Sequence, residues 1–111
     1  MTERDNKALN RIIHHIESIE TYMSSISSLE EFTNNSLIQD AVVFNLLQIG
    51  EIAKTRVSDK IKKQYPSIPW KKIYGFRNRL VHDYTDIILD IVYETIIFDL
   101  HNLYKQLSLI I

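Results

Sequence analysis

Apolar residues that recur at steps of three and four constrain the fold of this chain more than any other feature. In positions 5–25 they form one stripe along a helix, and apolar segments at 37–56, 69–82 and 87–107 predict three more helices. Only two glycines and two prolines occur in 111 residues, which is too few for a fold rich in tight turns. The sequence therefore predicts an all-α bundle of about four main helices.

Serines mark the starts of several predicted helices. Ser28 with Glu31, and again Ser36 with Gln39, have the spacing of a capping box, in which the serine caps the helix and the later side chain reaches back. Ser58 precedes another short helical segment, which a proline ends. One or two short helices are therefore expected between the main ones.

The length of the chain fits a single domain over residues 1–111. About 45% of the residues are apolar, but a domain of this size has a limited core. In the segments 37–56 and 87–107 the apolar residues cover more than one stripe, so each helix is expected to be buried on two sides. Two such helices in a small chain indicate a homodimer.

Two glycines, Gly50 and Gly75, lie inside helical segments. Each destabilises a helix by about 1 kcal/mol relative to alanine, so each needs a structural reason. Close contact between helices is the favoured explanation. The approach of backbone to a ligand is the alternative.

Basic residues concentrate in one part of the chain, although the net charge is only −1. The segment 54–79 contains one acid, Asp59, among many basic residues. These are Lys54, Arg56, Lys60, Lys62, Lys63, Lys71, Lys72, Arg77 and Arg79. Such a strip attracts phosphate groups, but a solvated helix surface would produce the same pattern, so both interpretations stay open.

Several classes of site are excluded or disfavoured by composition. The chain has no cysteine, which excludes disulfides and thiolate metal sites. The charged N-terminal segment has no apolar signal core, and no apolar run approaches the roughly 20 residues that span a bilayer. We therefore expect a soluble, cytoplasmic protein that does not enter a membrane. His14 and His15 lack the spacing of a helical zinc pair, so no metal ligand is predicted.

The segment from Arg77 to Tyr84 concentrates side chains that handle phosphate and protons. Arg77, His82 and Tyr84 form the pattern Arg-x4-His-x-Tyr. Histidine titrates near pH 6.5 and can give or take a proton at neutral pH. Arginine stays charged and can hold two phosphate oxygens at once. These residue types together point to chemistry on a phosphodiester.

This pattern resembles the motif of HEPN-domain ribonucleases, and its final tyrosine resembles that of the HepT-like toxins. The segments 47–51, 65–70 and 77–84 are similar to that family in order and spacing. The resemblance implies a HEPN-like helical bundle and a metal-independent endoribonuclease without a cofactor. It implies a homodimer in which the two motifs face each other. It also implies a toxin–antitoxin pair, whose antitoxin is a minimal nucleotidyltransferase that adds AMP to the motif tyrosine, here Tyr84.

The chemistry of RNA cleavage agrees with these residue types. Without a metal, the 2′-hydroxyl is the nucleophile, and the reaction needs a base, an acid and positive charge on the transition state. Arg77 would bind the scissile phosphate and His82 would transfer protons. The two are five residues apart, about 140° around a straight helix, and do not share one face. They must converge through the reach of arginine, a fraying helix end, or contributions from opposite subunits.

Supporting roles are expected for the neighbours of this pair, each beside a simpler alternative. Asn78 orients the site or forms a local cap, and Asp83 orients His82 or, as favoured here, starts the turn. Tyr84 shapes the site and accepts AMP, or packs its ring against the bundle. His82 has the alternative of a C-terminal helix cap, and Arg77 that of a surface ion pair.

Basic residues outside the pair are expected to contact the RNA backbone without taking part in the chemistry; they are Arg79, Lys71 and Lys72. Glu51 is interpreted as a helix-surface residue. Two other functions stay open. One is a non-catalytic helical subunit that partners a nucleotidyltransferase, and the other is an interaction protein that binds RNA without cutting it.

Overall fold

The computed structural model describes residues 1–82 and 86–111, and every regular element in that part of the chain is helical. In chain order the elements are α1 (Glu3–Met23), α2 (Leu29–Thr33), α3 (Ser36–Thr55), α4 (Asp59–Gln64), α5 (Trp70–His82), α6 (Asp86–Glu94), the π-helix η1 (Thr95–Asp99) and α7 (Leu100–Ile110). The prediction of an all-α bundle with main helices and short connecting ones is confirmed. No described helix is both long and apolar enough to cross a membrane.

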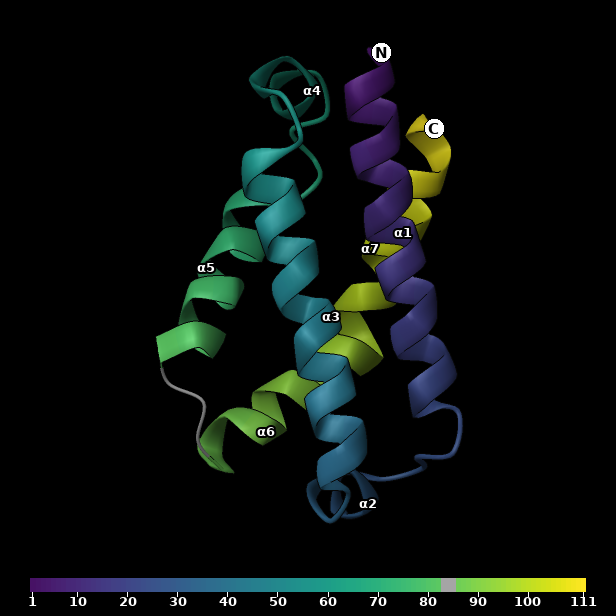
Figure 1. Cartoon of the computed structure of the whole chain (residues 1–111), viewed down its shortest axis with the longest axis vertical. Coiled ribbons are helices and arrows are strands. Elements are labelled where there is room, and N and C mark those ends of the chain that lie inside the picture. Colours follow the sequence, from purple (N-terminus) through teal and green to yellow (C-terminus); the bar gives the residue numbers. More distant parts are fainter. Residues whose placement is uncertain (83–85) are drawn as a thin grey trace.

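Helix α3 lies in the middle of the bundle, with α1 on one side and α5 on the other (Figure 1). This position explains why the apolar residues of α3 cover more than one stripe, and it confirms that the helix is buried on two sides. The C-terminal helices run behind α3 and α1 (Figure 1). The largest fully buried side chains come from most of these elements: Leu9, Ile12, Ile16, Ile19, Phe32, Val42, Ile61, Val92 and Leu107.

The predicted serine caps of α2 and α4 are confirmed. Ser28 accepts a hydrogen bond from the Glu31 backbone N–H, and Ser58 accepts one from the Ile61 N–H. The Glu31 carboxylate reaches back as expected, but it accepts from the backbone and side chain of Ser27. These hydrogen bonds from Ser27 lower the pKa of Glu31.

The predicted cap of α3 is wrong by one residue. Asn35 is the N-cap and accepts from the Ile38 N–H at 3.0 Å, while Ser36 is already helical. Gln39 is buried and does not complete a capping box, because its side-chain amide donates to the carbonyls of Phe32 and Thr33. Asparagine caps as well as serine does, and Gln39 is needed to satisfy the end of α2.

The single helix predicted over 87–107 contains a π-helical segment. At η1 the backbone hydrogen bonds change from the α-helical to the π-helical pattern. The Thr95 hydroxyl donates to the Ile91 carbonyl at 2.8 Å. Threonine at this position bonds the preceding turn, and π segments of this kind are associated with bends. The segment leaves Ile97 and Phe98 exposed at 47% and 67%. Apolar periodicity carries no signal for such a shift.

Asp5 connects the start of α1 to the start of α4. Its carboxylate is buried and accepts from the backbone N–H and hydroxyl of Ser58, both at 2.8 Å, and from the Thr2 hydroxyl at 3.0 Å. Burial alone raises the pKa of Asp5. The hydrogen bonds from Ser58 and Thr2, with the charge of Arg4, outweigh that effect and hold the pKa below its usual value of 3.8.

Asp5→Asn is expected to lower the free energy of unfolding at pH 7 by about 1.5–3 kcal/mol, because donors aimed at a carboxylate lose a charged acceptor. The folded-state pKa is depressed, so this stabilisation is present above the unfolded pKa. It is lost as pH falls through the folded pKa, in the acid range below about 4. Urea denaturation of both proteins at pH 7 and pH 3 measures the difference. An equal free energy of unfolding for Asp5→Asn and the parent protein at pH 7 would contradict this prediction.

Candidate active site

Helix α5 carries the described part of the motif on its C-terminal half. Arg77 is partly buried, with 29% of its side chain exposed, whereas Asn78 and His82 are exposed. His82 is the last residue of the helix. A cation there is favoured by the negative end of the helix dipole. Asp83 and Tyr84, which sequence reasoning also assigned to the site, lie outside the described residues.

The stem of Arg77 lies directly on the backbone of Gly50 in α3. An ideal Cβ at Gly50 would overlap the Cβ of Arg77 and lie 2.6 Å from its Cγ. The prediction of close helix contact at Gly50 is therefore confirmed, since only glycine leaves room for this stem. At Gly75 the prediction is wrong for the described residues, because apart from the adjacent residues and the backbone of α5 itself none of them has an atom within 4 Å of a Cβ built there.

The guanidinium of Arg77 is held by two side chains. Its Nη2 lies 3.1 Å from Oε2 of Glu51, and its Nη1 donates to Oδ1 of Asn78 at 3.4 Å. Its Nε is buried and has no hydrogen-bond partner in the described part of the chain. The sequence predicts Glu51 as a helix-surface residue. With 46% of its side chain exposed it does reach solvent, but it also pairs with the motif arginine, which sequence spacing did not indicate.

Arg77 and His82 are not brought together within the chain. Helix α5 stays helical through His82, so the two side chains leave it about 140° apart. Glu51 draws Arg77 toward α3, and no hydrogen bond between Arg77 and His82 occurs among the described residues. Because α5 is regular through His82, a frayed helix end does not bring Arg77 and His82 together. The reach of the arginine side chain and contributions from opposite subunits are the two other routes.

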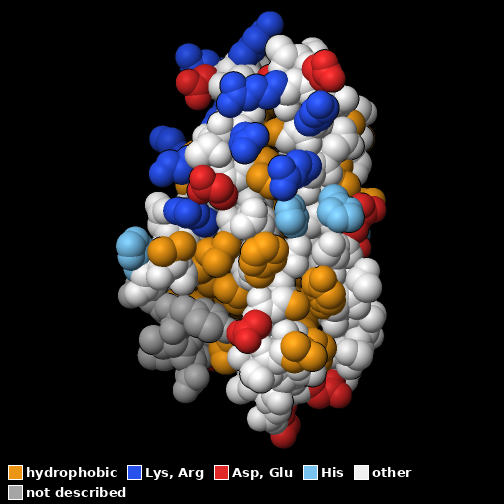
Figure 2. Space-filling view, in the orientation of Figure 1, with side chains coloured by type: hydrophobic (Ala, Val, Ile, Leu, Met, Phe, Trp, Pro, Cys, Tyr) orange, Lys and Arg blue, Asp and Glu red, His pale blue; other side chains and the backbone are white. Residues whose placement is uncertain are grey.

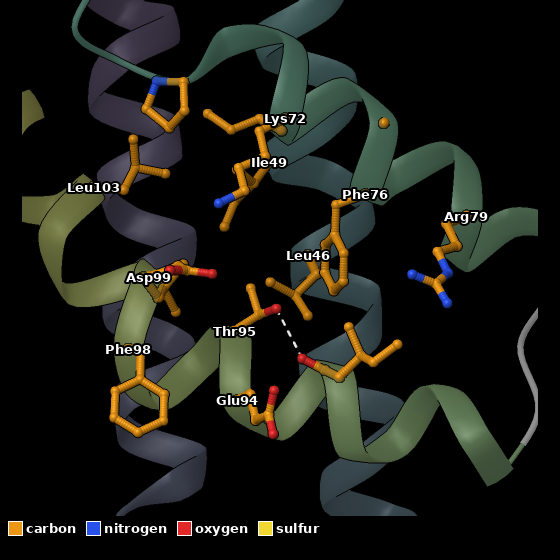
Figure 3. Close-up of a pocket in the computed structure, with 15 residues that line it drawn as sticks. Leu46, Ile49, Lys72, Phe76, Arg79, Glu94, Thr95, Phe98, Asp99 and Leu103 are labelled. Carbon is orange, nitrogen blue, oxygen red and sulfur yellow. Dashed lines mark hydrogen bonds between the residues drawn. The ribbon is translucent and has the colours of Figure 1, made fainter.

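The predicted RNA-backbone residues Lys71, Lys72 and Arg79 are all exposed on α5. Arg79 is two residues from Arg77, about 200° around the helix, and therefore faces the opposite flank. On that flank Lys72 and Arg79 line a groove of about 650 Å³ between α3, α5 and the C-terminal helices (Figure 3). This groove is thus separate from Arg77.

A basic surface covers α4 and the beginning of α5. Lys and Arg side chains gather at that end of the molecule (Figure 2), and lysines from both helices line a second hollow of about 560 Å³. Lys62 also lies 4.9 Å from the ring centroid of Tyr74. The lysines of the basic segment thus gather on α4 and the start of α5, whereas Arg77 and Arg79 lie further along α5 and face opposite flanks.

An apolar patch adjoins the motif on the outer surface of α3 and α5. Phe44 on α3 and Val81 on α5 are 59% and 50% exposed, and Leu47, about one turn after Phe44 on α3, is half-buried. Hydrophobic side chains are visible on this face, over α3 and the lower part of α5 (Figure 2). We call Phe44, Leu47 and Val81 the α3–α5 patch.

Of the adjacent histidines on α1, only His15 makes a hydrogen bond to a described residue through its ring. His15 Nδ1 lies 2.7 Å from Oδ1 of Asn45, whose amide nitrogen donates to the Ala41 carbonyl at 2.7 Å. His14 is exposed on α1, with its ring centroid 6.2 Å from that of His15. Among residues 1–82 and 86–111 no group of three His, Asp or Glu side chains is arranged to hold a metal ion.

Comparisons with known proteins place this chain in a family. The family described as "Ribonuclease HepT-like" matches residues 12–110. A Methanocaldococcus jannaschii protein named "Putative RNase MJ1216" is 35% identical over all of this chain and 91% of its own length. A Thermococcus cleftensis protein named "Probable ribonuclease HepT" is 29% identical over 80% of this chain and 88% of its own. No solved structure matches. The chain belongs to the HepT-like ribonuclease family.

Proposed function

We propose that this chain is a metal-independent endoribonuclease, the toxin of a toxin–antitoxin pair that acts on cytoplasmic RNA. One observation carries the proposal: a member of the HepT-like ribonuclease family has Arg77 and His82 in the pattern Arg-x4-His-x-Tyr at the end of α5. Arg77 and His82 are the catalytic residues. Asn78 supports Arg77 through its side-chain oxygen, and Asp83 and Tyr84 support the site.

The proposed reaction transfers the phosphate from the 5′-oxygen to the adjacent 2′-oxygen. The 2′-oxygen bonds to phosphorus while its proton passes to a base. The bond between phosphorus and the 5′-oxygen breaks, and that oxygen takes a proton from an acid. The products carry a 2′,3′-cyclic phosphate and a 5′-hydroxyl. His82 moves the protons, and Arg77 binds phosphate oxygens and stabilises the charge of the transition state.

A homodimer with a composite site is part of the proposal. One chain supplies one His82, and two proton transfers are served better by two imidazoles. Glu51 directs Arg77 away from the His82 of its own chain, which supports convergence across a subunit seam. The α3–α5 patch adjoins the motif, so a second copy seated there would cover apolar surface and bring its motif close.

The basic surface supports an RNA substrate. Lys71, Lys72 and Arg79 contact the RNA backbone beyond the scissile phosphate, and their contribution is sequence-independent and sensitive to salt. These residues hold the strand and do not take part in the chemistry.

The proposed antitoxin is a minimal nucleotidyltransferase that uses ATP. The Tyr84 hydroxyl oxygen bonds to the α-phosphorus of ATP, pyrophosphate leaves, and the phenolic proton is released. The AMP places a negative phosphate two residues from His82, where it repels the RNA backbone. This step explains why a motif tyrosine follows the catalytic histidine.

The proposal is tested with purified protein and RNA in the presence of EDTA. The expected result is internal cleavage with 2′,3′-cyclic phosphate ends, and loss of cleavage after incubation with a nucleotidyltransferase encoded by the adjacent gene and ATP. Mass spectrometry should then find AMP on Tyr84. A protein that cuts no RNA but stimulates nucleotide transfer by its partner would instead be a binding subunit, and salt-sensitive binding without product would indicate an RNA-binding protein.

A further inference from the structure

Glu51 and Gly50 of α3 lie against one side chain of α5, that of Arg77. The glycine lets the arginine stem lie on the α3 backbone, and the glutamate pairs with the guanidinium at 3.1 Å. We infer that these adjacent residues form a cradle that positions Arg77 for phosphate binding, with Glu51 as a positioning residue. The inference rests on the proposed function for the role of Arg77, but the cradle itself is testable without RNA.

The geometry leaves the arginine able to bind phosphate while it is held. Arginine has five N–H donors. Glu51 occupies one on Nη2 and Asn78 one on Nη1, so each terminal nitrogen keeps a second N–H. The buried Nε faces no acceptor in the described residues, which fits a side chain whose direction is set by its stem and by Glu51. A long flexible side chain held in one direction loses less freedom when it binds phosphate.

The carboxylate of Glu51 also opposes RNA binding, because it lies next to the phosphate-binding cation. Glu51 therefore has two opposite expected effects, which variants can separate: it positions Arg77, and its charge weakens the binding of RNA. A group that only neutralised charge would be improved by any neutral replacement. A positioning group must be replaced by one that still accepts a hydrogen bond from the guanidinium.

Three variants separate these effects by steady-state kinetics. Glu51→Ala is expected to lower kcat about 10- to 100-fold, because a misdirected catalytic group loses most of its effect. Its KM should stay equal or fall. Glu51→Gln keeps an acceptor oxygen and should keep kcat within about threefold while KM falls. Gly50→Ala forces the Arg77 stem to move and should lower kcat by about tenfold or more.

Glu20→Ala is the matched control, since Glu20 is an exposed acid on α1, across α3 from α5 (Figure 1). It should leave kcat and KM unchanged. Thermal melting checks that each variant is folded, and the Glu51 series stands alone if Gly50→Ala does not fold. Equal kcat for Glu51→Ala and the parent protein would overturn the inference, as would equal losses for Glu51→Ala and Glu51→Gln.

A second measurement is independent of RNA cleavage. In ¹⁵N–¹H spectra the Arg77 Nε–H should give a resolved signal that exchanges slowly with water, because this atom is buried. The signal should broaden or shift in Glu51→Ala and be retained in Glu51→Gln. If the parent protein cuts no RNA, the nuclease proposal fails while this result still decides the cradle. An unchanged signal in Glu51→Ala would refute it.

Discussion

His82→Ala is expected to lower the rate of RNA cleavage by about 10²- to 10⁴-fold without unfolding the protein, because it removes the group proposed to transfer protons. His82 is exposed at the end of α5 and contributes nothing to the buried core, so the melting temperature should change little. Cleavage is measured as initial rate on a labelled RNA, and folding by circular dichroism. The variant should also cease to inhibit growth when expressed without its antitoxin.

His14→Ala is the matched control for this result. His14 is exposed on α1, and α1 lies on the other side of α3 from α5 (Figure 1). It should cut RNA like the parent protein. Full activity of His82→Ala would remove the proposed mechanism. A large fall in melting temperature would mean that the histidine acts mainly as a helix cap.

Mixing two inactive variants shows whether the site is shared between subunits. In a composite site, a heterodimer of Arg77→Ala and His82→Ala retains one intact pair, with the arginine from one chain and the histidine from the other. After random exchange of subunits, roughly a quarter of the parent activity should return. No recovery, despite proven exchange, would exclude a site built from one arginine and one histidine of opposite chains, and would leave either both residues on one chain or a shared site that needs both imidazoles.

The helices were predictable because local patterns determine them. Apolar spacing specifies the buried face of α1, and serine side chains cap α2 and α4 in the way their positions predict. The sequence does not determine the cap of α3, because Asn35 and Ser36 are both good N-cap residues. A tertiary interaction decides between them, because the Gln39 side chain donates to a carbonyl at the end of α2 and so does not complete a capping box with Ser36.

The candidate site was predictable only as far as its motif. Arg77 and His82 follow from residue type and spacing, but the partner of Arg77 is Glu51, 26 positions earlier on a neighbouring helix. Periodicity places Glu51 on the outer face of α3 and gives no information about which side chain meets it. The glycine at position 50 was the available signal, because a glycine inside a helix indicates a close neighbour.

Phe44→Asp is expected to dissociate the proposed homodimer and, at low protein concentration, to abolish cleavage. Phe44 is 59% exposed on α3, and a second copy seated on the α3–α5 patch would bury it. An unpaired carboxylate in such a seam weakens association by about 2–4 kcal/mol, a factor of roughly 30 to 1,000 in the dissociation constant. Analytical ultracentrifugation over a range of concentrations measures the dimer, and cleavage rates are recorded at the same concentrations.

Phe98→Asp is the matched control, because it places the same charge on an equally apolar and 67% exposed position of η1. Phe98 lines the groove on the other flank of α5 from Arg77 (Figure 3). If the seam lies on the α3–α5 patch, this variant stays dimeric and active. If instead it dissociates while Phe44→Asp does not, the copies meet across the groove. The groove has a basic wall with Arg79 and an acidic wall with Glu94, which a two-fold partner would match. Arg77 would then face away from the seam, and a shared active site would be untenable.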